Sequence, residues 1–466
     1  MPSSFNARTI NSEYCQHTGE FKNAYMTHAS WEGENVSYSA RLNKVKDSMD
    51  TFVLSNSELC YEVIAGNKCY NVKYSQNIEG CNDSSFLFEC RGCSNCFGCV
   101  NLRNQNYNIF NQPYSREEYL KKIKEFNVDN NITLQQIQKK FENLKMQAIR
   151  KYANLVNSPL CTGDNIVNSY NAKECFDIYG DVKDCKFIQN CAQYLKDSYD
   201  GYGVGASADL LYEVFDTGVQ GSRLCFGAII YGGHDVYYSY NCHGSQNCFA
   251  CIGLRSKQYC IFNKQYSKEE YEELVLKIIK HMNDMPYIDS KGITYKYGEF
   301  FPTELSPFCY NETIAQEYFP LTKNEVFKQG YKWKDEEKRN YKIDIKNEDI
   351  PNSIENAKDT IIGKVIECQH QGTCNEQCTE AFKIIPDEFK FYQRMKLSIP
   401  HLCPNCRHYQ RLKQRNPMKL WIRQCMCEKE NHFHGADKCK VEFETSYAPD
   451  RPEIVYCEKC YQAEVY

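Results

Sequence analysis

The sequence predicts a mainly β chain in which two solenoid modules of the parallel β-helix type, each capped by a helix, precede small α+β domains rich in cysteine. Three observations support this fold class. A long phrase occurs twice, small residues recur at a fixed spacing in the first module, and the cysteine spacing changes in the last third of the chain.

The duplicated phrase defines the domain organisation. The segments 90–119 and 242–271 lie 152 positions apart and agree at 17 of 30 positions without a gap. A chain of 466 residues is also too long for one compact core. We therefore expect a first module over 1–125, a connecting helix over 126–160, a second module over 161–291, an aromatic and proline-rich connector over 292–365, and a metal-binding region over 366–466.

Serine and cysteine residues recur regularly in the first module. The series is Ser39, Ser48, Cys60, Cys69, Cys81 and Cys90. The spacings between successive members alternate between 9 and 12 positions, so that every second member recurs after 21 positions. A fixed period near 20 with small residues at equivalent places is typical of stacked coils. We expect coils of this length with these side chains in inward-facing columns. In the second module, spacings of 16 and 17 predict shorter coils, and the Gly-rich segment 201–209 is either a loop or a coil.

Each duplicated phrase ends in a predicted helix. Ser115 with Glu118, and Ser267 with Glu270, fit the capping box that begins a helix. An uncovered terminal coil would expose unpaired backbone groups and apolar surface. We therefore expect each phrase to close its coil stack and to cover it with a helix.

The thiols of the duplicated phrases allow two interpretations. Cys96 with Cys99, and Cys248 with Cys251, have the CxxC spacing of metal ligands, but they also suit small buried side chains. Cys93 of the first copy is replaced by a serine in the second. We favour packing over metal binding for these thiols.

Composition limits the class of protein. The chain has 28 cysteines, yet its first residues lack the basic head and apolar core of a signal peptide. We expect reduced thiols and a cytoplasmic, reducing compartment, which for a viral protein would be the virion or the host cytosol. No stretch approaches the ~18 apolar residues needed to span a bilayer, so no membrane association is expected.

The last third has the cysteine spacing of zinc sites. Two CxxC turns can complete a tetrahedron of thiolates around zinc with Zn–S distances of ~2.3 Å, which stabilises a segment too small for its own core. We expect two structural zinc ions. The first is assigned to Cys374, Cys378, Cys403 and Cys406, with Cys368 in reserve. The second is assigned to Cys427, Cys439, Cys457 and Cys460, with Cys425 and His432 or His434 as substitutes.

A basic segment lies between the two groups of cysteines. Residues 401–425 contain six cations and no acid, in a chain whose net charge is −4. Cations interleaved with aromatic rings are typical of surfaces that bind phosphates and stack on bases. The candidate nucleic-acid contacts are Arg407, Tyr409, Arg411, Lys413, Arg415, Lys419, Trp421 and Arg423. The alternative interpretation is that these residues pack the zinc modules together.

The same strings carry a resemblance to a known family. CPNCRHYQRLKQRNPMKLWIRQC and ETSYAPDRPEIVYCEKCYQAEV, together with the duplicated phrase, resemble an uncharacterised family of zinc-ribbon-containing proteins from small-genome bacteria and large DNA viruses. The resemblance covers nearly the whole chain. It implies solenoid modules followed by zinc ribbons, and no established activity.

Together these features predict a non-enzymatic, zinc-binding scaffold that associates with single-stranded nucleic acid through its basic segment. The alternative is a component of a protein assembly, such as a virion. A third possibility is an enzyme that uses a solenoid groove. The sequence has no nucleophile elbow, phosphate-binding glycine loop or HExxH motif, and four thiolates leave no open position on zinc.

Overall fold

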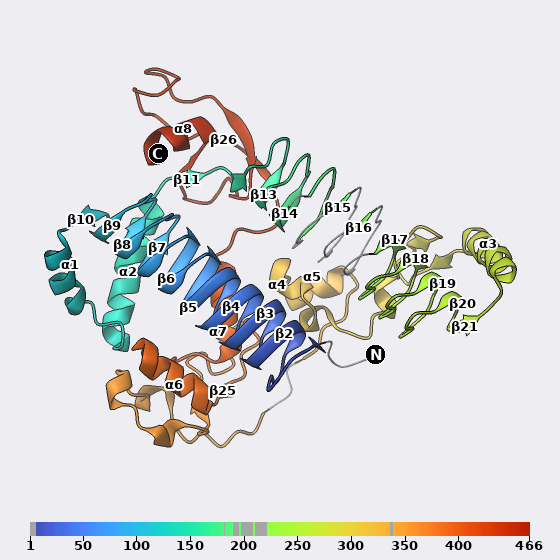
Figure 1. The fold of residues 1–466 in the computed structure, drawn as a ribbon, viewed down its shortest axis with the longest axis horizontal. Helices are drawn as coiled ribbons and strands as arrows, with labels where there is room; N and C mark the ends of the chain where they lie inside the picture. The colour runs from blue at the N-terminus through green and yellow to red at the C-terminus, as the bar shows by residue number, and fades with distance from the viewer. Residues whose placement is uncertain (1–5, 181, 190–194, 197–207, 210–220, 336–338) are drawn as a thin grey trace.

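The structure is a computed structural model that describes residues 6–180, 182–189, 195–196, 208–209, 221–335 and 339–466. It is a mixed α/β fold in which two stacks of short parallel strands run side by side, with helices at their ends and along one side (Figure 1). The cysteine-rich C-terminal third contacts both stacks. Most of the Gly-rich segment 201–209 lies outside the described residues.

The first coil stack is a ten-stranded sheet whose strands follow one another in chain order. They are β1 (Asn6–Ala7), β2 (Gln16–Tyr25), β3 (His28–Ser37), β4 (Ala40–Met49), β5 (Phe52–Asn67), β6 (Tyr70–Glu79), β7 (Asn82–Phe88), β8 (Ser94–Val100), β9 (Asn106–Ile109) and β10 (Gln112–Pro113). Gln16 pairs with His28, His28 with Ala40, and Ala40 with Phe52, all in parallel. The chain therefore returns to the same position after twelve residues.

The backbone explains the twelve-residue coil. Every third residue has a left-handed conformation, as at Asn71, Tyr74 and Asn77, with φ values of 52°, 50° and 55°. Each such residue turns the chain by one corner, and asparagine tolerates this conformation better than most residues. Four three-residue sides thus form one coil, and one residue of each side points inward, as Cys60 and Val63 do.

The expected coil period of 21 is therefore wrong. The marked serines and cysteines do face inward, and they are buried. However, a spacing of 12 is one full coil and a spacing of 9 is three of its four sides, so Ser48 and Cys60 share a column whereas Ser39 and Ser48 lie on different sides. A column recurs every twelve residues, as in the pairing of Cys60 with Val72.

In the second coil stack, paired strands recur after eleven to thirteen residues. It contains β12 (Leu155–Val156), β13 (Gly163–Val167), β14 (Cys175–Tyr179), β15 (Leu195–Lys196), β16 (Ala208–Asp209), β17 (Ser222–Cys225), β18 (His234–Tyr237), β19 (Gln246–Phe249), β20 (Gln258–Ile261) and β21 (Lys264–Gln265). Ser222 pairs with His234, His234 with Gln246, and Gln246 with Gln258. The coil lengths predicted from the cysteine and serine spacings of this module are thus also wrong for these strands.

Both duplicated phrases close a stack in the same way. The last parallel strand folds back as an antiparallel hairpin, β9 with β10 and β20 with β21. A helix follows, α1 (Arg116–Lys122) or α3 (Lys268–Asp284), and both predicted capping boxes are present. The hairpin pairs the edge of the final coil, and Tyr119 or Tyr271 of the helix packs beside it.

The connecting segment forms α2 (Asn131–Gln147), which lies against the side of the first coil stack. Leu134, Ile137 and Phe141 pack there with Phe86 and Phe97. Two further strands follow the helix: β11 (Arg150–Lys151), which pairs with the C-terminal β28, and β12. The connecting helix is therefore part of the packed body of the protein.

The connector has short helices. After the hairpin of β22 (Tyr287–Ile288) and β23 (Thr294–Tyr295) come α4 (Ala315–Tyr318) and α5 (Lys323–Lys328), and a capping box of Thr322 and Glu325 begins α5. Single 3-10 turns lie at Ile123–Glu125, Thr303–Leu305, Tyr310–Glu312, Asn347–Asp349, Ile354–Asn356 and Asp359–Ile361. No helix in the described ranges is both long and apolar enough to cross a membrane.

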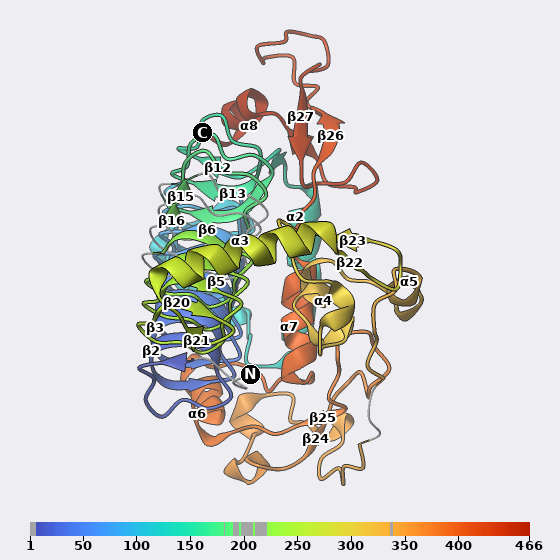
Figure 2. The ribbon, with the colours of Figure 1, turned by 90° about the vertical axis from the view of Figure 1, so that its right-hand side faces the viewer.

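The C-terminal third contains two small α+β units. The first has β24 (Ile366–Glu367), β25 (Ala381–Phe382), α6 (Pro386–Met395) and α7 (Pro404–Lys413), and the second has β26 (Trp421–Gln424), β27 (Glu442–Thr445), β28 (Val455–Tyr456) and α8 (Glu458–Val465). Figure 2 shows α6 and β25 at one end of the molecule and β26, β27 and α8 at the other, with α7 between them. We call these the first and second ribbon.

The inward thiols of the coil stack are buried in its core, and we expect them to act as packing residues. We expect Cys96→Ala to lower the free energy of unfolding by about 1–2 kcal/mol, because it removes one small buried side chain. The larger Leu54→Ala should cost about 2–5 kcal/mol. Urea unfolding measures both changes, and release of a metal ion by Cys96→Ala would contradict the packing role.

Candidate metal centres

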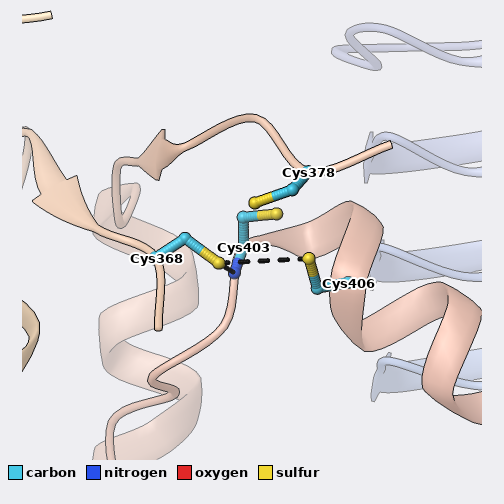
Figure 3. A group of neighbouring side chains, drawn as sticks. All are labelled: Cys368, Cys378, Cys403 and Cys406. Atoms are coloured by element: carbon cyan, nitrogen blue, oxygen red, sulfur yellow. Dashed lines mark hydrogen bonds between the residues drawn. The ribbon is translucent and has the colours of Figure 1, made fainter. Parts of the chain in front are cut away.

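Four buried cysteines meet in the first ribbon. The sulfur atoms of Cys368, Cys378, Cys403 and Cys406 all lie within 4.8 Å of one another (Figure 3). The Cys368 and Cys406 sulfurs are 3.9 Å apart, close to the ~3.8 Å expected between thiolates that share a tetrahedral ion with bonds of ~2.3 Å. The group can therefore hold one metal ion.

Local structure places these thiols. Cys368 directly follows β24 and Cys378 precedes β25, so the two ends of one hairpin bring them together. Cys403 is the N-cap residue of α7, Pro404 begins the helix, and Cys406 lies in its first turn. A CxxC at a helix start directs both sulfurs to the same side. The Cys403 backbone N–H donates to the Cys368 sulfur at 3.3 Å.

The neighbouring thiols prepare Cys403 for metal binding. Hydrogen bonds from the Cys368 and Cys406 thiols lower the pKa of Cys403, although burial opposes this change. A thiolate is the form that binds a metal ion. The group therefore favours loss of a proton when a cation enters.

The second ribbon contains a similar group. The sulfurs of Cys425, Cys439, Cys457 and Cys460 lie within 4.8 Å of one another, and all four residues are buried. Cys439 and Cys457 are 4.0 Å apart. Burial raises the pKa of Cys425 to about 11, so this thiol needs a bound cation to become a thiolate at neutral pH.

The two ribbons are built in the same way. In each, the first cysteine follows a strand, the second lies before the returning strand, and the last two begin a helix. Three hydrogen bonds between backbone groups of the first ribbon have an equivalent in the second: Cys368 N–H to Glu380 O and Cys425 N–H to Val441 O; Gln369 N–H to His401 O and Met426 N–H to Val455 O; Arg407 N–H to Cys403 O and Tyr461 N–H to Cys457 O. In each ribbon a fourth bond runs from a backbone N–H to a sulfur, from Cys403 to Cys368 Sγ and from Cys457 to Cys425 Sγ. The C-terminal third is thus a second internal repeat, which its sequence hides because its loops differ in length.

The predicted ligand sets need two corrections. Cys368, which the sequence left in reserve, replaces Cys374 in the first group, and Cys425 replaces Cys427 in the second. Sequence spacing favoured Cys374 because it forms a tight CxxxC pair with Cys378. Strand pairing selects the ligand instead, because the hairpin of each ribbon holds the cysteine that follows its first strand next to the start of the helix. The sequence feature that indicates the correct ligand is a cysteine directly after a short strand.

The displaced residues lie beside the four-cysteine groups. Cys374 meets His370, Glu376 and Cys406 within 4.8 Å, and Cys427 meets His432, His434 and Cys460. In each ribbon the shared residue is the last cysteine of the CxxC. The thiols of the duplicated phrases form no comparable group in the described part of the chain.

The basic segment does not form one exposed surface. Arg407 and Arg411 are buried, and Lys413 pairs with Glu376 and Arg415 with Asp177. Arg423 donates to backbone carbonyls of the second ribbon, at Ala448 and Glu453. Internal acids and carbonyl groups thus pair with these five cations.

The aromatic candidates and the last lysine are placed differently. The Tyr409 hydroxyl is buried, whereas Lys419 is exposed and its Nζ lies 5.2 Å from the centre of the Trp421 ring, which is partly exposed. Of the eight candidates, Lys413, which pairs with Glu376, and Lys419 are exposed.

The strongest contact of the basic segment is a buried ionic cluster. Asp50 on the first coil stack is fully buried, and its carboxylate lies 2.8 Å from Arg411 Nη1 and 3.2 Å from Arg407 Nε. Arg407 also lies 3.4 Å from Glu388 of α6. Burial raises the pKa of Glu388, and the charge of Arg407 and the hydroxyl groups of Tyr392 and Tyr38 lower it.

Comparisons with known proteins do not identify the chain. No protein-family model and no curated protein matches it. The resemblance to zinc-ribbon proteins of bacteria and DNA viruses therefore stays a prediction, and the assignment of the two groups depends on their geometry.

The ligand assignment can be tested with paired variants. Cys368→Ser removes a member of the first group, whereas Cys374→Ser leaves all four thiols in place. We expect Cys368→Ser to lower the bound metal by one ion per chain and Cys374→Ser to leave it unchanged, as measured by mass spectrometry of the elements. Equal loss in both variants would show that the two thiols share the role.

The buried cluster predicts a large effect of Asp50. Asp50→Asn removes the charge that balances two buried guanidinium groups, so we expect a loss of about 3 kcal/mol in unfolding free energy. Asp83→Asn is a matched control, because Asp83 has the same left-handed backbone but is exposed; its change should stay within about 0.5 kcal/mol. Similar losses in both variants would refute the role of the cluster.

Proposed function

We propose that this protein is a non-enzymatic scaffold in which two zinc ribbons fix two parallel β-helix solenoids relative to one another. The main support for this proposal is that the ribbons contact both coil stacks through buried polar groups. On α7, Arg411 pairs with Asp50 of the first stack, and Arg415, just beyond the helix, pairs with Asp177 of the second. One short basic segment therefore bridges the stacks.

The second ribbon makes similar contacts. β28 pairs in parallel with β11, which lies between α2 and the second stack in the chain. The Ser446 hydroxyl donates to Asp164 of the second stack, and Arg103 of the first stack donates to the Tyr461 hydroxyl at 3.1 Å. These contacts support a connection of each ribbon to both coil stacks, which we call the joint.

Zinc is the metal that suits the two groups. Four thiolates in a tetrahedral arrangement are typical of structural zinc sites, and they leave no open position for a substrate. This favours a structural role over catalysis. All cysteines in the described residues are free thiols, which supports a reducing compartment: the cytoplasm or, for a viral protein, the host cytosol or the virion.

The partner that we propose is another protein in an assembly. The connector exposes five phenylalanine rings with exposed fractions from 37% to 55%: Phe300, Phe301, Phe308, Phe319 and Phe327. Such a concentration of exposed apolar rings favours contact with a protein. The internal pairing of the basic segment removes the main support for nucleic-acid association, which becomes the second candidate.

Scattering can test the scaffold. Removal of zinc by a chelator should increase the radius of gyration while the β-sheet circular dichroism remains, because the coils have inner cores of their own, whereas the core that joins the first ribbon to the first stack includes the four cysteines of the first metal-binding group. Small-angle X-ray scattering before and after chelation measures this. An unchanged radius in the zinc-free protein would contradict the proposal.

A titration distinguishes the second candidate. The scaffold predicts no retention of single-stranded RNA or DNA even at about 50 mM salt, where phosphate contacts are strong. The native chain is compared with Lys419→Glu and, as a control on a distant exposed lysine, Lys268→Glu. Retention that is lost only in Lys419→Glu would replace the assembly role by nucleic-acid binding.

A further inference from the structure

The loop between Cys427 and Cys439 brings a second set of ligands to the second ribbon. Cys427, His432, His434 and Cys460 each offer a ligand atom, and these atoms lie within 4.8 Å of one another. Two sulfurs and two imidazole nitrogens form a donor set typical of tetrahedral zinc. This set uses three residues that the four-cysteine group does not.

His432 has the surroundings of a metal-bound histidine. Its Nδ1 lies 3.1 Å from the Cys427 sulfur, and its Nε2 lies 3.0 Å from a carboxylate oxygen of Glu464 on α8. A carboxylate that accepts the Nε2 proton fixes the tautomer with a free electron pair on Nδ1. That electron pair faces the Cys427 sulfur and is available to bind a metal ion.

His434 provides a second, independent observation. Its Nδ1 lies 2.6 Å from the Asp437 carbonyl oxygen, which can only accept a hydrogen bond. Nδ1 therefore has the proton, and Nε2 has the free electron pair. That Nε2 atom is buried and has no hydrogen-bond partner in the part of the chain that the structure describes. A buried, unpaired nitrogen is costly unless something binds it.

The ligand count agrees with two ions at this end of the molecule. The four-cysteine group and the Cys427 group share Cys460 only. Each group supplies four donors, so two tetrahedral ions can be completed if the Cys460 thiolate bridges them. A thiolate sulfur has more than one electron pair for such a bridge.

We propose that Cys427, His432, His434 and Cys460 bind a further zinc ion, which shares the Cys460 thiolate with the ion of the four-cysteine group. The ion fastens the loop 428–438 to α8, because the loop supplies both histidines and the helix supplies Cys460 and Glu464. Four protein ligands leave no open position, so the role is structural.

The first ribbon differs at the corresponding place. There His370, Cys374 and Glu376 approach Cys406, but the buried His370 Nδ1 faces the Glu376 carboxylate at 3.2 Å, and Lys413 already pairs with that carboxylate. The further ion is therefore proposed for the second ribbon alone. It rests on the proposed zinc in the four-cysteine groups.

Metal content of the full-length chain, purified in the presence of zinc and dialysed, tests the proposal. We expect three zinc ions per chain in the native protein and two in His432→Asn/His434→Asn. His281→Asn, on the exposed side of α3, is the matched control and should retain three. Two ions in the native protein, or three in the double variant, would overturn the further site and leave the scaffold standing. Fewer than two in the native protein would overturn the proposed function as well.

A spectroscopic measurement keeps the test valid if the double variant folds poorly. Zinc-edge X-ray absorption of the native chain should contain nitrogen as well as sulfur neighbours, because the four-cysteine groups contribute sulfur alone. A spectrum with sulfur neighbours only would exclude the two histidines as ligands and refute the site.

Discussion

The contact of Asp50 with Arg407 and Arg411 is the interaction on which the assembly of the ribbons and the coil stacks depends. Asp50 is fully buried, and the two arginines come from one face of α7. A buried carboxylate with two guanidinium groups is stable only in accurate geometry, since each charge has lost its water. Both the coil and the helix must therefore be held rigidly before they meet.

The two elements obtain this rigidity in different ways. The coil holds Asp50 at a corner with a φ of 56°, between inward side chains that pack in a continuous core. The start of helix α7 lies in the core that the first ribbon shares with the first coil stack, where Cys403 and Cys406 belong to the first four-cysteine group. A metal ion bound there would orient the arginines that follow one and five residues after Cys406.

Parts of this structure could be predicted from sequence because the signals are local. The capping boxes at Ser115 and Ser267 depend on neighbouring residues, and both occur. The coil length could not be derived from Ser39 and Cys60 alone, because several inward columns have the same small residues. Likewise, Cys368 and Cys425 enter their groups through hairpin pairing, and the buried pairing of Arg411 comes from an acid 361 residues away. Local spacing carries no information about such contacts.

Hydrogen exchange across the joint is the most direct test of this account. Tyr38, Met49 and Tyr61 of the first coil stack share a core with the first ribbon, whereas Cys90 and Cys96 lie in the inner core of the coils, to which no described ribbon residue belongs. The account predicts that chelation of the metal speeds amide exchange in residues 38–61 and leaves residues 90–99 protected. Unchanged exchange in residues 38–61 of the metal-free protein would show that the ribbon does not hold the joint.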